Sequence, residues 1–369
     1  MTLTETFRVK GVDTSVIYFR DRSLLAHSNE TGTKVLIKDV KTGDIIHTLK
    51  TNDVWPLGKD DNFVRHEDFL LIQDDVDDID TFSLFDLEKE CLYPIEYVST
   101  PRIYIDNRYL VFECLDENYR LNKLCFFDTQ RENDISYPIL TGCSIEYPTM
   151  GLNWYQSLRV KGEGAKFPTI LKVNIEDVRS TITISEFPAH CKGSKASRNN
   201  YSLGKDDFVY FEGIEQDGLL LSRLTYKNEL LRKITIKGVD FSELQISKAR
   251  MYYRSVSEVS FLLFSIRAGA VRIYRLINLD TGECIWSFDS YWDGEPDLGT
   301  HLGVIVHTDE NNKIQGYYLM SFRTGEVDYY SYSTAMDINF SAIKSISAET
   351  LILADTSGEN FVGYDVSYN

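Results

Sequence analysis

The sequence predicts an all-β fold, in the form of a closed β-propeller, from three features: many aromatic side chains, few prolines, and a repeated pattern of short strands and polar turns. The 369 residues include 23 Tyr and 20 Phe but only 8 Pro. Aromatic and β-branched residues favour strands, whereas Pro interrupts them. Runs of such residues recur between turn signals along the chain, and no segment sustains helical periodicity.

The stretch INLDTGECIW, from Ile277 to Trp286, shows the repeated unit. An apolar run leads into a polar turn that contains Thr281 and Gly282, and a second run ends in Trp286. Strand, tight turn and strand is the pattern of a β-hairpin. The polar residues that open the corresponding turns along the chain are Asp39, Asp86, Asp128, Asn174, Thr225, Asn278, Ser321 and Asp365.

These eight anchor residues are about 47 residues apart on average, which is the spacing of four-stranded propeller blades. Each hairpin supplies the last two strands of a blade, and two further short strands fit before it, as SVIYFRD and SLLAHS do before Asp39. We therefore expect eight blades in a single domain, residues 1–369. A ring of seven blades, with the copy near Thr225 as an insertion, is the alternative.

The two ends of the chain predict how the ring closes. Few residues follow Asp365, so the last blade lacks its outer strand, whereas TETFRVKG near the start is a lone strand before the first complete blade. We expect residues 5–10 to form the missing outer strand, because that pairing removes the free edges of an open ring.

The spacing Asp280-Thr281-Gly282-x-x-x-Trp286 resembles the tryptophan-docking hairpins of quinoprotein alcohol dehydrogenase-like propellers, which have eight blades. The general layout is equally similar to WD-repeat propellers, although the Trp-Asp dipeptide is missing from the blade ends. Acidic, Tyr-rich, degenerate repeats also look like the C-terminal propellers of fungal F-box proteins. We expect Trp286 to be a structural residue that packs between blades.

The quinoprotein resemblance would imply a pyrroloquinoline quinone held over calcium, an Asp base and, in many members, a disulfide between adjacent cysteines. This chain has no adjacent cysteines, so an oxidoreductase is kept only as a remote alternative. The scattered cysteines also lack C-x-x-C spacing, and we expect buried free thiols at Cys91, Cys114, Cys125, Cys143, Cys191 and Cys284.

The formal net charge of −17 argues against nucleic acid and anionic lipid as partners, since both are bound through Lys and Arg. No secretion signal and no apolar run of membrane-spanning length is found. We therefore expect a cytoplasmic or nuclear protein whose partner is a protein or peptide, most simply a basic one.

The segment DDVDDID concentrates this negative charge, and we expect it in the loop between the second and third strands of the second blade, on the top face. It lacks the residue order and the Gly of an EF-hand loop. A solvated loop, a contact for a basic partner and a calcium site are the three open interpretations. Its carboxylates belong to Asp74, Asp75, Asp77, Asp78 and Asp80.

Aromatic residues lie in turn-rich stretches of the same predicted face: Trp55, Trp154, Tyr291 and Trp292. They are candidate hot spots of a protein interface, because Trp and Tyr bury large areas with few rotors lost. An equally weighted alternative is that these aromatic residues are structural and pack the inner ends of strands against the next blade. A long basic segment, residues 188–205, connects the last strand of one predicted blade to the first strand of the next. We expect this segment to be a loop.

No catalytic, cofactor-binding or metal-ligating set emerges from the sequence. The nucleophile elbow, the phosphate-binding loop and the dinucleotide fingerprint are all missing, and the six His lack metal-ligand spacing. We therefore expect a non-catalytic protein–protein interaction platform, monomeric within a larger complex. It would be either the substrate-recognition propeller of an F-box-type ubiquitin ligase or a free-standing scaffold in another complex.

Overall fold

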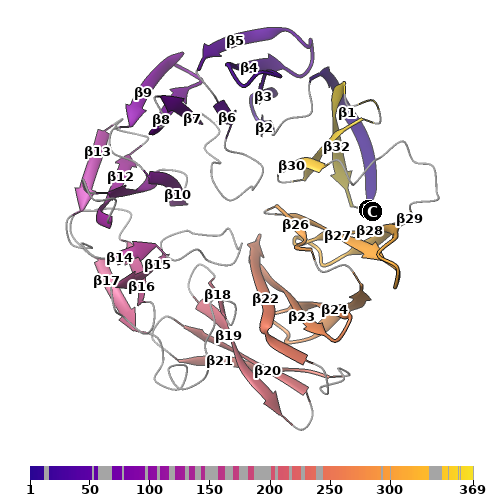
Figure 1. Cartoon of the computed structure of the whole chain (residues 1–369). Helices are drawn as coiled ribbons and strands as arrows, with labels where there is room; N and C mark the ends of the chain where they lie inside the picture. Colours follow the sequence, from indigo (N-terminus) through magenta and orange to yellow (C-terminus); the bar gives the residue numbers. More distant parts are fainter. Residues whose placement is uncertain are drawn as a thin grey trace. The chain divides into compact units, whose positions relative to one another are not determined.

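The structure is a computed structural model of the chain, and it describes about 70% of the residues, mostly as strands and turns (Figure 1). None of the described residues belongs to a helix long and apolar enough to cross a bilayer. The described residues are 1–11, 16–51, 54–56, 69–76, 79–95, 99–105, 109–115, 121–128, 133–137, 143–145, 157–162, 169–173, 182–186, 201–203, 207–215, 218–225, 229–237, 244–291, 294–299, 301–331, 343–347, 349–355, 357 and 359–368.

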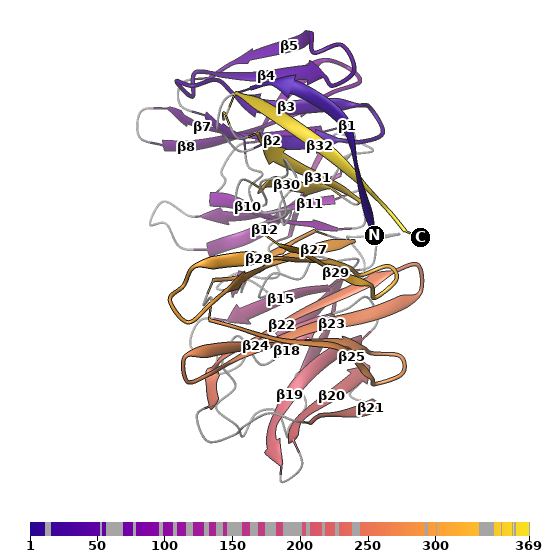
Figure 2. The ribbon, with the colours of Figure 1, turned by 90° about the vertical axis from the view of Figure 1, so that its right-hand side faces the viewer.

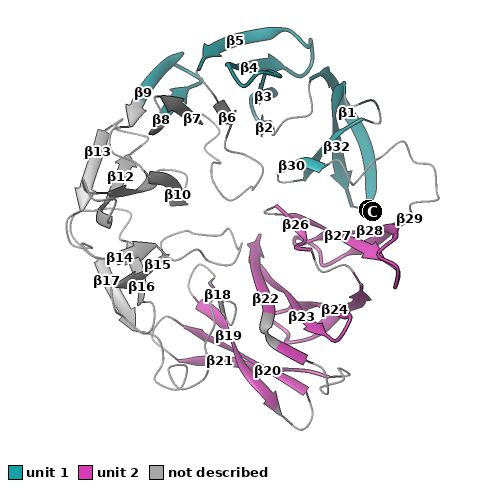
Figure 3. Cartoon of the chain, in the orientation of Figure 1, with its two compact units in different colours: residues 1–142, 335–369 teal, residues 143–334 magenta. Residues whose placement is uncertain are grey.

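The chain divides into two compact units, which Figure 3 shows in different colours. Unit 1 comprises residues 1–142 and 335–369, and unit 2 comprises residues 143–334. Each unit is made of antiparallel sheets of four strands, and in most sheets the strands follow one another in chain order. This up-and-down order is the build of a propeller blade.

Unit 1 contains the sheets β2-β3-β4-β5, β6-β7-β8-β9, β10-β11-β12-β13 and β1-β32-β31-β30. Its strands are β1 (Thr2–Lys10), β2 (Val16–Phe19), β3 (Leu24–Ser28), β4 (Lys34–Asp39), β5 (Ile45–Lys50), β6 (Val54–Pro56), β7 (Phe69–Val76), β8 (Ile79–Asp86), β9 (Cys91–Ile95), β10 (Ser99–Ile105), β11 (Tyr109–Leu115), β12 (Leu121–Asp128), β13 (Asn133–Tyr137), β30 (Ile343–Ser347), β31 (Thr350–Ala354) and β32 (Asn360–Ser367).

Unit 2 contains the sheets β14-β15-β16-β17, β18-β19-β20-β21, β22-β23-β24-β25 and β26-β27-β28-β29. Its strands are β14 (Cys143–Ile145), β15 (Ser157–Gly162), β16 (Thr169–Val173), β17 (Ile182–Glu186), β18 (Tyr201–Leu203), β19 (Asp207–Glu215), β20 (Gly218–Thr225), β21 (Leu230–Ile236), β22 (Leu244–Val256), β23 (Val259–Ala268), β24 (Val271–Asn278), β25 (Cys284–Ser290), β26 (Asp297–Leu298), β27 (Leu302–Thr308), β28 (Ile314–Ser321) and β29 (Val327–Ser331).

The N-terminal strand completes the sheet formed by the last three strands. β1 pairs antiparallel with β32 from Thr2 opposite Ser367 to Lys10 opposite Asn360, and the two strands run side by side in Figure 2. The outer-strand position predicted for residues 5–10 is therefore confirmed. The pairing is reinforced by packing, because Phe7 and Val9 of β1 are buried in one cluster with residues of β31, β32, β2 and β3.

The residues that mark the sequence repeat cap its turns. The Asp39 Oδ1 atom accepts hydrogen bonds from the backbone N–H groups of the second and third residues after it, at 2.7 and 3.2 Å. Asn278 Oδ1 and Ser321 Oγ accept the same two bonds in their own turns. In each of the three turns a glycine follows four residues after the anchor with φ of +78° or +79°, a conformation that glycine adopts without steric strain. The stretch from Ile277 to Trp286 is accordingly the β24–β25 hairpin, as predicted.

The residue after each anchor connects its turn to the core through a backbone hydrogen bond. In four repeats this residue is apolar and buried, and its N–H donates to a carbonyl just before or at the start of the second strand of the same sheet. A backbone bond at this point satisfies the N–H group of a buried residue, which would otherwise be left unpaired. The four donor–acceptor pairs are Val40–Ser23, Leu279–Ser260, Phe322–His301 and Val366–Glu349.

Two expectations are wrong at specific residues. Cys284 is an exposed free thiol and Cys91 is only half-buried, and each begins the outer strand of its sheet. The basic segment 188–205 is not a loop throughout, since Tyr201–Leu203 forms β18 and pairs with β19. Residues 187–200 lie outside the described part of the chain.

Candidate interaction surface

The predicted acidic cluster lies in strands at three of its positions. Asp74 and Asp75 belong to β7, Asp80 belongs to β8, and Asp75 lies opposite Asp80 in the antiparallel register. The expectation of a loop is wrong at these positions, because Val76 and Ile79 pair with each other and extend the ladder toward the turn. Paired β-branched residues favour such an extension.

Two of the predicted aromatic contacts can be placed. Trp55 lies in β6 opposite Gln73 of β7, and its neighbour Val54 lies opposite Asp74, so the backbone of Trp55 is next to the acidic strand. Trp55 is thus in the first strand of its sheet rather than in a turn. Tyr291 follows β25 in unit 2, and 37% of its surface is exposed. The remaining predicted site residues lie outside the described part of the chain: Asp77, Asp78, Trp154 and Trp292.

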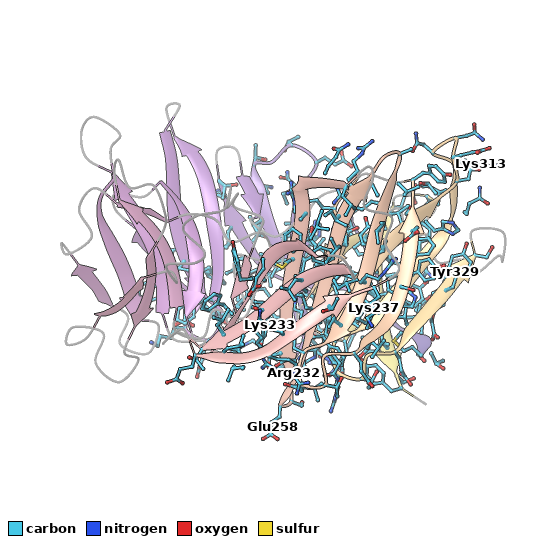
Figure 4. All side chains as sticks on the ribbon, turned by 90° about the horizontal axis from the view of Figure 1, so that it is seen from below. Arg232, Lys233, Lys237, Glu258, Lys313 and Tyr329 are labelled. Carbon is cyan, nitrogen blue, oxygen red and sulfur yellow. The ribbon has the colours of Figure 1, made fainter. Side chains whose placement is uncertain are left out.

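A cluster of five aromatic side chains lies on the surface of unit 2, and we call it the aromatic surface: Trp286, Phe288, His307, Tyr318 and Tyr329. Trp286 and Phe288 come from β25, and the other three come from β27, β28 and β29 of the next sheet. Tyr329 is 44% exposed on the last strand of its sheet (Figure 4), and the other four are half-buried.

The rings of the aromatic surface are in direct contact. Ring centroids are 4.3 Å apart for Phe288 and Tyr318, 5.1 Å for Trp286 and Tyr318, and 4.8 Å for Tyr318 and Tyr329. The planes of these three pairs are tilted by 45° to 60°, and tilted pairs at such separations are favourable. Tyr318 touches Trp286, Phe288 and Tyr329, and therefore lies at the centre of the cluster.

The packing beneath these rings explains why the sequence places them here. Residues two apart on a strand share a face, so Trp286 and Phe288 both face the next sheet. They join a core cluster that includes buried Leu276 of their own sheet and buried Ile305 and Met320 of the next one. The aromatic surface is thus the solvent-facing margin of the core between two sheets of unit 2.

The sheet β18-β19-β20-β21 holds the hairpin that carries Trp286. Arg223 donates from Nη1 to Asp280 Oδ1 at 2.7 Å and from Nε to Asp207 Oδ2 at 2.6 Å. Arg232 donates from Nη1 to the backbone carbonyl of Thr281 at 2.7 Å. Charge-assisted bonds of this length are the stronger hydrogen bonds in proteins. The Asp-Thr pair of the repeated turn is therefore fixed from the neighbouring sheet by two arginines.

Hydrogen bonds orient Tyr329 and His307. The Tyr329 hydroxyl donates to the carbonyl of Gln315 at 3.0 Å and lies 3.1 Å from His307 Nδ1. Because the hydroxyl has a single proton, His307 Nδ1 carries the proton of their shared bond and Nε2 of the neutral ring is an acceptor. A Cβ atom on Gly316 would stand 2.6 Å from the Tyr329 hydroxyl, so glycine lets this ring lie across β28.

The aromatic surface is uncharged at neutral pH. Burial lowers the pKa of His307 below its usual value, and the nearby Asp309 carboxylate opposes that effect. Burial raises the pKa of Tyr318 and of Tyr329. The imidazole and both phenols are therefore neutral, which disfavours an anionic ligand and suits an apolar ligand with polar groups.

Two hydrogen-bond donors of this surface are open. Within the part of the chain that the structure describes, neither the indole N–H of Trp286 nor the hydroxyl of Tyr318 has a hydrogen-bond partner. Asp309 and Glu310 follow the strand that carries His307, and the Asp309 carboxylate is near enough to act on the pKa of that imidazole. Two other acidic residues of this region, Asp289 and Glu295, are paired with Arg275 and Arg250. The surface therefore combines aromatic faces, two open donors and the nearby carboxylates of Asp309 and Glu310.

Sequence reasoning identified Trp286 as a packing residue but missed its four partners. A signal for one partner was present, since Trp286 and Phe288 have the alternate spacing of one strand face. The contacts with His307, Tyr318 and Tyr329 cross from one sheet to the next. Their register depends on how two sheets pack, which no local pattern encodes.

In the described ranges, no group of three or more His, Cys, Asp or Glu could hold a metal ion. No protein-family model matches the sequence, and no curated protein matches it either. Solved structures resemble the chain at low identity.

The dihydro-heme d1 dehydrogenase NirN in complex with DHE is 10% identical with a TM-score of 0.49, covering 97% of this chain and 78% of that one. A eukaryotic initiation factor is 10% identical with a TM-score of 0.47, covering 87% and 89%. The β-propeller domain of Cps50 (Swd1) from Myceliophteria thermophila is 10% identical with a TM-score of 0.38, covering 99% and 100%. The fold is therefore defined by the strand order of the sheets.

Proposed function

We propose that this protein is a non-catalytic protein–protein interaction platform of the β-propeller type, and that the aromatic surface is a contact site. The observation that carries the proposal is the contiguous set of half-exposed rings around Tyr318, with open donors on Trp286 and Tyr318. Aromatic residues with a polar tip are enriched where proteins bind each other, because they bury large areas while keeping a hydrogen bond.

The architecture we propose is a single domain in which eight blades close a ring. The sheets formed by the described strands number eight, and the pairing of β1 with β32 supports closure through the N-terminal strand. In a closed ring no sheet is left with an uncovered face at the ends of the array.

The partner we propose is a basic protein or peptide, because the chain has a net charge of −17. An acidic face that includes Asp74, Asp75 and Asp80 would steer such a partner toward the protein. The protein would act as a monomer in a larger complex of the cytoplasm or nucleus. That complex is either an F-box-type ubiquitin ligase, with this chain recognising substrates, or a scaffold assembly without ligase activity.

The experiment is affinity purification of the tagged full chain from cells, with quantitative mass spectrometry of the proteins retained. Tyr329→Ala removes the most exposed ring of the aromatic surface. Ile45→Ala is the matched control, because Ile45 is 53% exposed on β5, the outer strand of another sheet. Both variants are first compared with the wild type by thermal melting.

We expect Tyr329→Ala to lose specific partners and Ile45→Ala to retain them. Truncation of an interface hot spot weakens binding by about 30-fold, since it removes about 2 kcal/mol. Identical sets of partners from all three proteins would overturn the proposal for this surface.

A further inference from the structure

We infer that the aromatic surface binds a proline-rich segment in the polyproline II conformation, flanked by basic residues. This inference rests on the proposed function and specifies the ligand of its contact site. It follows from three properties of the described residues: the open donors, the neutral aromatic faces and the acidic surroundings.

The open donors match the backbone of a polyproline II helix. Such a helix has no internal hydrogen bonds, so its carbonyl groups point outward and are free to accept. The Trp286 indole N–H and the Tyr318 hydroxyl are donors without a partner in the described structure, and their rings are 5.1 Å apart at the centroids. The two rings are thus close enough for one extended ligand to lie across both.

The rings match the side chains of the same ligand. Proline rings are apolar and project at regular intervals, and aromatic-lined surfaces are the known mode of binding such segments. Trp286, Tyr318 and Tyr329 offer three neighbouring rings that stay neutral at physiological pH. A polyproline II ligand is already ordered before it binds, so it loses little conformational entropy.

Acidic residues beside the aromatic surface favour a ligand whose proline run is flanked by basic residues. Asp309 and Glu310 follow β27, which carries His307, and Asp328 precedes Tyr329 on β29. Asp289 and Glu295 of the same region pair with Arg275 and Arg250, so the charge that would attract a basic flank comes from Asp309 and Glu310 and from the net charge of −17. Arg or Lys on either side of the proline run would be attracted to it, with an effect that salt weakens.

The test is a titration of the full chain with a labelled peptide of eight Pro flanked by two Arg on each side, followed by fluorescence anisotropy. The control peptide replaces the eight Pro by four Gly-Ser pairs and keeps the four Arg. Charge and length are thus equal, and only the polyproline II conformation and the proline rings differ. The proteins are the wild type, Tyr318→Phe, Tyr329→Ala and Ile45→Ala.

We expect saturable binding of the proline peptide at least about tenfold tighter than that of the control peptide. Tyr318→Phe keeps the ring and removes one donor, so it should weaken binding by about fivefold. Tyr329→Ala should weaken binding by about 30-fold, and Ile45→Ala should leave it unchanged.

Equal binding of the two peptides would overturn the inference, because charge alone would then explain the interaction. So would proline-peptide binding that is indifferent to Tyr318→Phe and Tyr329→Ala. Partners that depend on Tyr329 in the purification experiment, together with no binding of the proline peptide, would overturn the ligand class and leave the proposed function standing.

Discussion

His27 should make this protein lose stability in mild acid. Its side chain is 2% exposed in β3, and its Nδ1 atom lies 2.8 Å from the carbonyl oxygen of Ser28. Because a carbonyl only accepts, Nδ1 carries the proton of the neutral ring. The buried Nε2 atom has no hydrogen-bond partner in the described structure. Protonation would therefore place a charge in a buried site where Nε2–H has no acceptor.

The magnitude follows from the two pKa values of His27. Burial lowers its pKa in the folded protein from 6.5 to about 4, with a further lowering by Lys38 and an opposing effect of the Ser28 carbonyl. The unfolded chain takes up the proton below pH 6.5, whereas the folded protein takes it up only near pH 4. The free energy of unfolding thus falls as the pH is lowered through this window, by about 3 kcal/mol in total.

The assay is urea unfolding at pH 7.0 and pH 4.5, followed by tryptophan fluorescence, for the wild type and His27→Leu. Carboxylates that titrate in this range affect both proteins alike, so the difference between the two isolates His27. We expect the wild type to lose about 2.5 kcal/mol more than His27→Leu between the two pH values. Parallel pH profiles of the two proteins would refute this account of the site.

Four further predictions concern the repeats. Deletion of residues 1–11 removes two buried side chains and leaves the outer edge of β32 unpaired, so the free energy of unfolding should fall by about 5 kcal/mol in urea titrations, and an unchanged midpoint would contradict the strand's role. Gly43→Ala should lower stability by about 1 kcal/mol through its φ of +78° alone, since nothing lies within 4 Å of the added Cβ. Gly282→Ala should lower stability more than Gly43→Ala does, because Arg232 Cδ lies 3.1 Å from the added Cβ. Equal melting temperatures of the two variants would show that the Arg232 side chain moves away without cost. Trp286→Ala should lower stability by about 3 kcal/mol by calorimetry, and a change under about 0.5 kcal/mol would place the ring outside the core.

The repeat was predictable because its signals are local. Asp39, Asn278 and Ser321 are recognisable as turn openers, since short polar side chains bond to backbone N–H groups two and three residues later. The glycine four residues after each of them is required by its positive φ. The N-terminal strand was predictable for a different reason, because the last repeat lacked a strand and residues 5–10 were left without a partner.

The features that the sequence did not predict depend on contacts between residues far apart in the chain. Asp280 is fixed by Arg223, which is 57 positions away in the sequence, and no local pattern shows that pair. The aromatic surface depends in the same way on the packing of β25 against β28. The acidic strand ends were missed because Asp disfavours strands, and that preference is overridden at Asp75 and Asp80 by the ladder that continues past them.

The most direct test of the proposed contact site is site-specific photo-crosslinking in cells. A p-benzoylphenylalanine is placed at position 329 in place of Tyr329, and at position 45 in place of Ile45 as the matched exposed control. Ultraviolet irradiation then joins the photoreactive ring to any protein in contact with it. If the aromatic surface is a contact site, position 329 gives a discrete crosslinked protein that position 45 does not give. The absence of an adduct at position 329, or the same adducts at both positions, would contradict this account.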